Sequence, residues 1–176
     1  MVLDAARRLL VDEGPEAVTP LRISEMTGVA RTTIYRHWPD REQLLLETLA
    51  AEEPDHPSSR TGNLREDLIT FLEHVARRIG RRPMAPLLAA MAERAQRDPE
   101  TASLQRDRLE HRMEPLREIL EAGIETGELP GNLDVGATVA RLAGPLFYQR
   151  LIARGAAGRE LITSLVDTFL AAPTAR

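Results

Sequence analysis

Apolar residues recur at helical spacing along most of the chain, and no strand-like alternation of apolar and polar positions is found. The first helix is expected to run to about Glu13 and to end at Gly14–Pro15. Thr19–Pro20 predicts the start of a short second helix, with threonine as the cap and proline in the first turn. Ile23 and Met26 are expected to face inward from that helix. The apolar positions of the first helix are Val2, Leu3, Ala6, Leu9 and Leu10.

The stretch from Gly28 to Trp38 has the pattern of a turn followed by a third helix. Glycine tolerates the left-handed conformation that often ends a helix, and helical spacing resumes within about three residues, as in a helix-turn-helix. Ile34 and Trp38 are four residues apart and can share a buried face. The other positions carry guanidinium, hydroxyl and methyl groups that can bind DNA bases or phosphates, namely Arg31, Thr32, Thr33, Tyr35 and Arg36.

Six further helices are predicted after Pro39. Asp40 is expected to cap the fourth helix, which fades at residues 52–54 before a loop-like segment at residues 55–63. Pro115 lies inside the long seventh helix and is expected to kink it. Asp134 is expected to cap the eighth helix, and Gly155–Gly158 separates it from the ninth. The apolar positions are Leu44, Leu45 and Leu49 with Thr48 in the fourth helix; Leu64, Leu68, Phe71, Leu72, Val75 and Ile79 in the fifth; Leu87, Leu88, Met91 and Ala95 in the sixth; Leu104, Leu109, Met113, Leu116, Leu120 and Ile124 in the seventh; Val139, Leu142, Leu146, Phe147 and Leu151 in the eighth; and Leu161, Leu165 and Phe169 in the ninth.

The composition favours a helical bundle with an aliphatic core. Aromatic residues make up only 3% of the chain, whereas 43% of residues are hydrophobic, so leucine, alanine, valine and isoleucine must fill the core. The absence of cysteine excludes disulfides and cysteine-based zinc sites. No apolar run approaches the roughly 18 residues of a membrane span, and no signal-peptide pattern is found, so we expect a cytoplasmic protein.

The charge distribution is locally basic within an acidic protein. The net charge of −4 argues against indiscriminate coating of nucleic acid. Between Gly28 and Arg41, however, three arginines oppose one aspartate, and His37 lies beside them. An acidic protein can bind DNA through one such basic edge.

The segment from Ile23 to Leu45 closely resembles the DNA-binding segment of TetR/AcrR-type repressors. That family has a small turn, a recognition helix that ends in Tyr-x-His-aromatic, and a basic residue at the start of a long helix. Here these features are Gly28, Tyr35–Arg36–His37–Trp38 and Arg41. The order and spacing agree from Ala5 to Leu49, and residues 144–148 more loosely resemble a segment found in one branch of the family's C-terminal domains.

The resemblance implies an all-α fold of about nine helices. It places a three-helix DNA-binding domain at residues 1–46 and a helical ligand-binding and dimerisation domain at residues 47–176. It further implies a homodimer that binds a near-palindromic double-stranded DNA operator as a repressor and is released by a small-molecule effector. No cofactor and no enzymatic activity are expected.

The family pattern assigns three groups of residues. Base contacts are expected from Arg31, Thr32, Thr33 and Arg36, and phosphate contacts from Tyr35, His37, Arg41 and the helix start at Thr19. The ligand cavity is expected to be lined by Phe71, Val75, Leu88, Met91, Met113 and Leu116. The dimer interface is expected to include Leu142, Leu146, Phe147, Leu161, Leu165 and Phe169.

Several alternatives remain open. The arginines between Arg77 and Arg82 are interpreted as a solvated helix end, and the alternative is a second DNA contact or an anchor for an anionic ligand. The negative net charge, with no basic arm before the first helix, is compatible with a helical ligand-binding or scaffold protein whose DNA-binding domain does not function. A helical hydrolase would need acids and histidines on one inner face, which the spacing of the four histidines does not offer. Asp55–His56 resembles half of a metal-dependent phosphohydrolase signature, which we attribute to chance.

Overall fold

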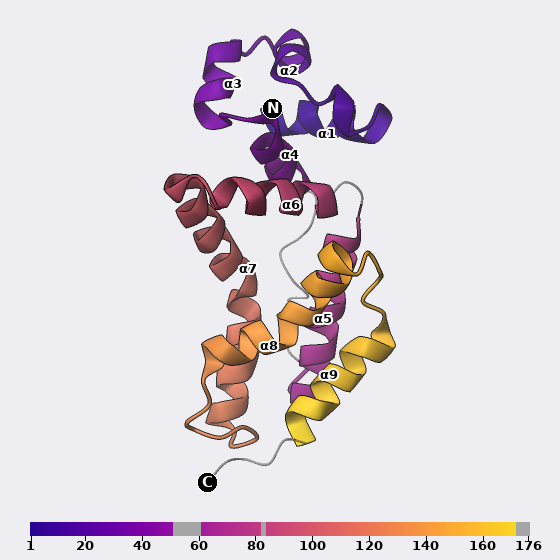
Figure 1. Ribbon diagram of the computed structural model, residues 1–176, viewed down its shortest axis with the longest axis vertical. Coiled ribbons are helices and arrows are strands. Elements are labelled where there is room, and N and C mark those ends of the chain that lie inside the picture. The colour runs from indigo at the N-terminus through magenta and orange to yellow at the C-terminus, as the bar shows by residue number, and fades with distance from the viewer. Residues whose placement is uncertain (51–60, 82–83, 172–176) are drawn as a thin grey trace. The chain divides into compact units, whose positions relative to one another are not determined.

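A computed structural model describes residues 1–50, 61–81 and 84–171, and every regular element in these ranges is a helix (Figure 1). The predicted all-α fold is therefore confirmed. The helices are α1 (Val2–Asp12), α2 (Pro20–Thr27), α3 (Arg31–His37), α4 (Arg41–Ala50), α5 (Leu64–Gly80), α6 (Met84–Ala95), α7 (Pro99–Glu125), α8 (Val135–Phe147) and α9 (Arg159–Ala171), with short helices η1 (Pro15–Ala17) and η2 (Tyr148–Ile152). The expected end of the fourth helix at residues 52–54 and Asp55–His56 lie outside the described residues.

The chain divides into two compact units. The first contains residues 1–54 and 86–93, and the second contains residues 55–85 and 94–176. By this division the described part of α4 and most of α6 belong to the first unit. The sequence places a domain boundary at 46/47, and that boundary stays a prediction.

In the first unit α1 contacts α2, η1 and α4, and α2 contacts α3. Small or aliphatic side chains fill the space between these helices: Ala5, Ala6, Leu9, Val18, Ile23, Ile34, Leu44 and Leu45 are buried. Met26 was expected to face inward, but 47% of its surface is exposed. Within the eight-residue α2, Ile23 is the one completely buried residue. Met26 lies at the edge of the buried face, where solvent reaches it.

In the second unit α5 is the central helix and contacts α7, α8 and α9 (Figure 1). Asn63 caps its start, because the side-chain oxygen accepts a hydrogen bond of 3.1 Å from the backbone N–H of Glu66. Its stripe of buried apolar side chains includes Leu68, Phe71 and Leu72. A helix that buries this stripe on three neighbours fixes the core of the unit.

The eighth helix begins as the sequence predicts and ends in a different way. Asp134 Oδ1 accepts from the N–H of Ala137 at 2.9 Å, which confirms the predicted cap. The chain then continues directly from α8 into η2, which is a π-helix. Short π-helices are rare and frequently occur at functional sites.

Candidate nucleic-acid interface

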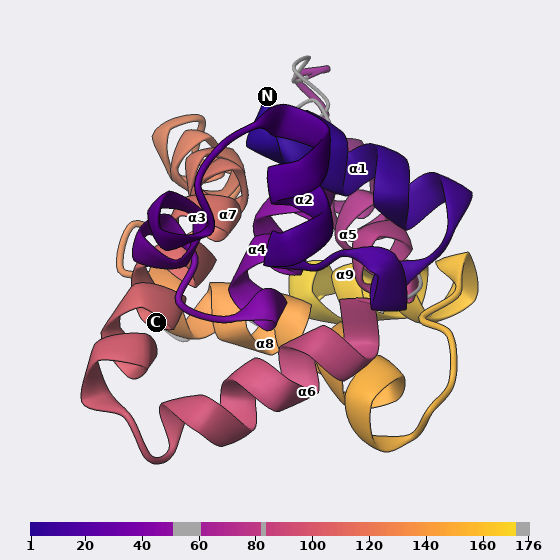
Figure 2. The ribbon, with the colours of Figure 1, turned by 90° about the horizontal axis from the view of Figure 1, so that it is seen from above.

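Helix α2 is capped at both ends. The turn after it leads into α3 (Figure 2). Thr19 Oγ1 accepts from the N–H of Arg22 at 3.3 Å, and Pro20 occupies the first turn. Gly28 ends the helix with φ 72° and ψ 0°, in the left-handed region. A Cβ atom there would meet no atom within 4 Å, so glycine is favoured by the backbone conformation rather than by lack of space. The predicted cap, stop and turn are confirmed.

Helix α3 is held by residues at its inner face and at its end. Ile34 is completely buried. Trp38 follows the helix as its C-terminal cap and is half-buried, and its Nε1 donates a hydrogen bond of 2.6 Å to Glu47 on α4. The rings of His37 and Trp38 lie 5.7 Å apart. One buried aliphatic residue and one aromatic residue thus fix the orientation of a seven-residue helix that could not persist alone.

The remaining face of α3 carries the predicted DNA-binding residues. Arg31, Thr32, Tyr35, Arg36 and His37 are exposed, whereas Thr33 is half-buried. Among the described residues, neither the Arg31 nor the Arg36 side chain has a hydrogen bond or an ion pair. Two guanidinium groups with all donors available, beside hydroxyl groups on the same short helix, can bind phosphate oxygens or guanine edges.

Arg41 has partners that the sequence did not indicate. Its Nε donates to the carbonyl of Val18 at 3.2 Å, its Nη2 donates to the carbonyl of Pro15, and it forms an ion pair of 3.1 Å with Glu16. These contacts fasten the start of α4 to the η1 segment. Two of its three guanidinium nitrogens are therefore occupied within the protein, and its predicted phosphate contact must use the third.

A hollow lies beside α3 in the same unit. A pocket of about 540 Å³ is lined by the start of α1 and by Val29, Thr33, His37 and Trp38. The sequence predicts DNA contacts for Thr33 and His37. Val29 lies in the turn just before α3, so its place beside them is local, whereas only the fold brings the start of α1 to this pocket.

The six residues predicted to line a ligand cavity fall in different units. Phe71, Val75, Met113 and Leu116 are buried in the second unit, on α5 and α7. Leu88, half-buried, and Met91, buried, lie in the part of α6 that belongs to the first unit. The cavity stays a prediction.

The six predicted interface residues separate into two groups. Leu142 and Leu146 are 1% and 0% exposed, so they form part of the core of the second unit and have no surface to offer a partner. The periodicity of α8 marked them as apolar but could not show which neighbour covers them. The four that retain some exposed surface are Phe147, Leu161, Leu165 and Phe169.

The described residues contain no cluster of three histidine, cysteine or acidic side chains able to hold a metal ion. Within the same ranges, none of the helices is both long enough and apolar enough to span a membrane.

The first unit contains a helix-turn-helix whose inner face is buried and whose outer face carries two exposed arginines without partners among the described residues. A larger helical unit completes the chain. Together these features define the class of helix-turn-helix DNA-binding transcriptional regulators. Residues 2–48 match the model of bacterial regulatory proteins of the tetR family, and residues 59–169 match the tetracyclin repressor-like C-terminal domain. The chain therefore belongs to the TetR family of transcriptional regulators.

Individual relatives agree with this assignment over nearly the whole chain. The uncharacterized HTH-type transcriptional regulator YdeS of Bacillus subtilis is 29% identical over 167 residues, which cover 94% of this chain and 84% of that protein. The HTH-type transcriptional regulator AqdR of Rhodococcus erythropolis is 25% identical over 144 residues, covering 81% and 69%. Among solved structures, the TetR family regulator SCO0332 superposes with a TM-score of 0.81 at 29% identity, covering 96% of this chain and 94% of that one.

Proposed function

We propose that this regulator is a homodimeric, ligand-responsive repressor that acts in the cytoplasm, where its DNA target is found. The observation that carries the DNA-binding mode is the exposed face of α3, where the guanidinium groups of Arg31 and Arg36, beside Thr32, have no partner within the described part of the chain. Arg31, Thr32, Thr33 and Arg36 are proposed to contact bases. Tyr35, His37, Arg41 and the start of α2 at Thr19 are proposed to contact phosphates, because a helix N-terminus offers free N–H groups to anions.

Dimerisation is proposed through α8, η2 and α9. Phe147, Leu161, Leu165 and Phe169 are partly exposed, and Tyr148 and Ile152 on η2 are 58% and 69% exposed. Apolar surface of this extent on neighbouring elements favours contact with a second copy. A two-fold dimer would place two recognition helices about one turn of DNA apart, roughly 34–36 Å, and would therefore require a near-palindromic operator.

Ligand control is proposed through a shift of α4. A molecule that fits the second unit only after this shift would separate the two recognition helices and weaken binding to the operator. Reciprocity then requires the operator to weaken binding of that molecule by the same factor, typically about 5–150-fold. Phe71, Val75, Met113 and Leu116 remain the proposed cavity residues of the second unit.

The first experiment selects genomic fragments that bind the purified protein and measures their affinity in gel shifts. An Arg31→Ala/Arg36→Ala variant is expected to lose specific binding. The matched control, Arg7→Ala/Arg8→Ala, removes two exposed arginines of α1 from the same unit and is expected to retain it. If no fragment is selected, or if the two variants behave alike, the protein does not read DNA through α3, and a helical binding protein without DNA recognition becomes the better description.

The second experiment screens small molecules for release of the selected fragment. Repression is supported if the protein lowers transcription from that fragment and an active compound restores it. The ligand mechanism is contradicted if such a compound binds the free protein and the protein–DNA complex with equal affinity.

A further inference from the structure

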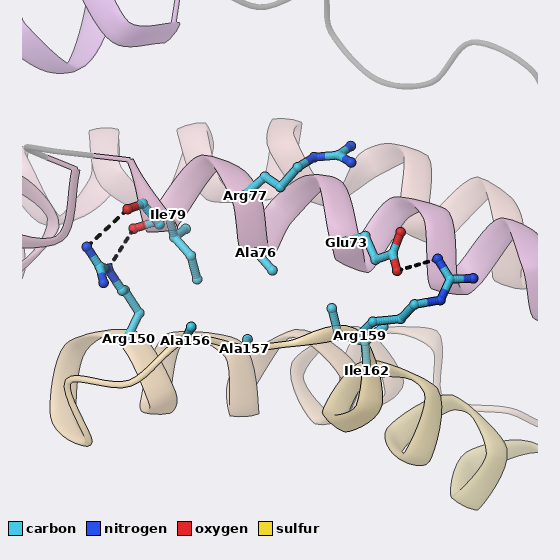
Figure 3. A pocket seen from close by; sticks show the side chains of 10 residues that line it. Glu73, Ala76, Arg77, Ile79, Arg150, Ala156, Ala157, Arg159 and Ile162 are labelled. Atoms are coloured by element: carbon cyan, nitrogen blue, oxygen red, sulfur yellow. Dashed lines mark hydrogen bonds and ion pairs between the residues drawn. The ribbon is translucent and has the colours of Figure 1, made fainter.

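A slot in the second unit lies outside the predicted ligand cavity. It has a volume of about 380 Å³ and is bounded by the C-terminal half of α5, by η2, and by the segment that leads into α9 (Figure 3). Its walls are small or aliphatic side chains, namely Ala76, Ile79, Ala156, Ala157 and Ile162. A volume of this size falls within the range of small-molecule sites.

One end of the slot is closed by Arg150. Its Nε and Nη2 donate to the carbonyls of Ile79 and Gly80 at 3.2 and 3.1 Å, at the C-terminal end of α5 (Figure 3). Carbonyls in the last turn of a helix receive no hydrogen bond from the helix itself. The guanidinium of Arg150 donates to them instead, and these bonds hold its side chain in place. Arg150 belongs to the π-helix η2, which directs it toward α5. A fixed positive charge therefore stands at this end.

The other end of the slot carries an ion pair between Arg159 and Glu73. Arg159 Nη1 donates to Glu73 Oε1 at 2.8 Å (Figure 3). The Arg159 side chain is 74% exposed, whereas that of Glu73 is 23% exposed. Only one of the guanidinium nitrogens is used in this contact, so the others remain accessible to an anion. The Arg77 guanidinium points away from the slot in Figure 3 and adds positive charge only at its rim.

We infer that this slot binds a small amphiphilic carboxylate, with the carboxylate at Arg159 and the hydrocarbon part along the alanine-lined walls. Arg150 and Arg159, with Arg77 at the rim, oppose the single charge of Glu73 and give the slot an excess of positive charge in a protein whose net charge is −4, which favours an anionic ligand. The aliphatic walls favour an apolar body. From Glu73 to Gly80 the axis of α5 rises about 10 Å, the length of an extended chain of about eight carbon atoms.

The geometry makes Glu73 a competitor of the ligand. Its carboxylate already occupies part of the Arg159 guanidinium, so a ligand carboxylate must share or replace that partner. Removing the charge of Glu73 should therefore strengthen binding, whereas removing the charge of Arg159 should weaken it. If the ion pair merely held the slot together, both changes would act in the same direction.

The test is calorimetric titration of the full-length protein with n-octanoate below its micelle concentration. Octanol and acetate, which lack the charge and the chain respectively, serve as probes of each part of the ligand. We expect saturable binding of one octanoate per chain, with octanol and acetate at least about tenfold weaker. Binding equal to that of octanol, or no saturable binding at about 1 mM, would overturn the proposal.

Variants then test the residues. Arg159→Gln should weaken octanoate binding at least about tenfold, and Glu73→Gln should strengthen it. Ala76→Leu should fill the slot and abolish binding, whereas Ala153→Leu, at an exposed residue outside it, should have no effect. Arg65→Gln breaks a different ion pair between α5 and α9, with Asp167, and should leave binding unchanged.

The same variants distinguish a ligand site from a contact between chains. If Arg159→Gln and Ala76→Leu change the sedimentation coefficient of the protein and no variant changes octanoate binding, a second copy covers the slot and the proposal fails. Because octanoate binding is measured without DNA, the result is independent of the proposed repressor function.

Discussion

Trp38 and Glu47 are joined by a hydrogen bond of 2.6 Å from the indole Nε1 to a carboxylate oxygen. Trp38 ends the recognition helix and Glu47 lies in the middle of α4. This bond ties the orientation of α3 to that of α4 within the first unit.

Loss of this bond should destabilise the first unit. We expect Trp38→Phe to lower the free energy of unfolding by about 1–3 kcal/mol, because hydrogen bonds to charged groups contribute about 1.5–3 kcal/mol and the smaller ring also packs less surface. Urea unfolding measures the loss. Glu47→Gln keeps an acceptor at the same position and should lose less, and equal stability of all three proteins would show that the bond contributes nothing.

Arg31 should determine preference at one base pair. Arg31→Ala is expected to weaken operator binding by about 1–3 kcal/mol and to relax selectivity at that position, because a guanidinium can bind guanine through two donors. Competition gel shifts with single-base operator variants measure this. Arg8→Ala, an exposed arginine on α1, is the matched control. An equal loss on operator and random DNA would assign Arg31 to the phosphate backbone instead.

Arg41 should contribute both to stability and to phosphate binding. Arg41→Ala removes the bonds to the Val18 and Pro15 carbonyls and is expected to lower the free energy of unfolding by about 1–3 kcal/mol. The slope of log affinity against log salt should be shallow for the wild type, roughly −4 to −5 for a dimer, and flatter by about one per lost phosphate contact in this variant. Lower stability with an unchanged slope would limit Arg41 to a structural role.

The proposed interface should fail when charge is introduced. Phe147→Arg and Leu165→Arg are each expected to give monomers and to abolish specific DNA binding, because burying an unpaired guanidinium between subunits is costly. Sedimentation velocity measures the oligomeric state. Thr70→Arg places the same side chain on an exposed position of α5 and should leave the dimer intact. A dimer unaffected in both interface variants would place the contact elsewhere.

The ion pair between Arg65 and Asp167 should make stability depend on pH. The hydrogen bonds from Arg65 hold the pKa of the Asp167 carboxyl below its ordinary value of 3.8. A folded-state pKa below the unfolded value means that the contribution is present above about pH 4 and is lost as the pH falls through the folded pKa. Wild type should therefore be more stable than Asp167→Asn at pH 7, and the difference should shrink toward pH 3. Thermal unfolding of both proteins measures it, and a difference independent of pH would exclude the ion pair as its cause.

The sequence by itself determined the start and end of α2 and the start of α4. Thr19–Pro20, Gly28 and Asp40 act on backbone groups within three or four residues, so their effects do not depend on distant parts of the chain. The same local logic placed the cap at Asp134. The identity of α3 as the candidate recognition helix also followed from the sequence, because a helical segment after the turn at Gly28 carries one apolar inner position, Ile34, among polar residues.

Only the tertiary structure decided which apolar or charged residues remain accessible. Met26 is exposed, and Leu142 and Leu146 are buried, although the periodicity of each helix treated them as equivalent to their neighbours. Arg41 and Arg150 both donate to backbone carbonyls far away in sequence, which no local pattern encodes. Burial and long-range hydrogen bonding depend on which elements pack together, and helical periodicity specifies that a face is apolar without specifying what covers it.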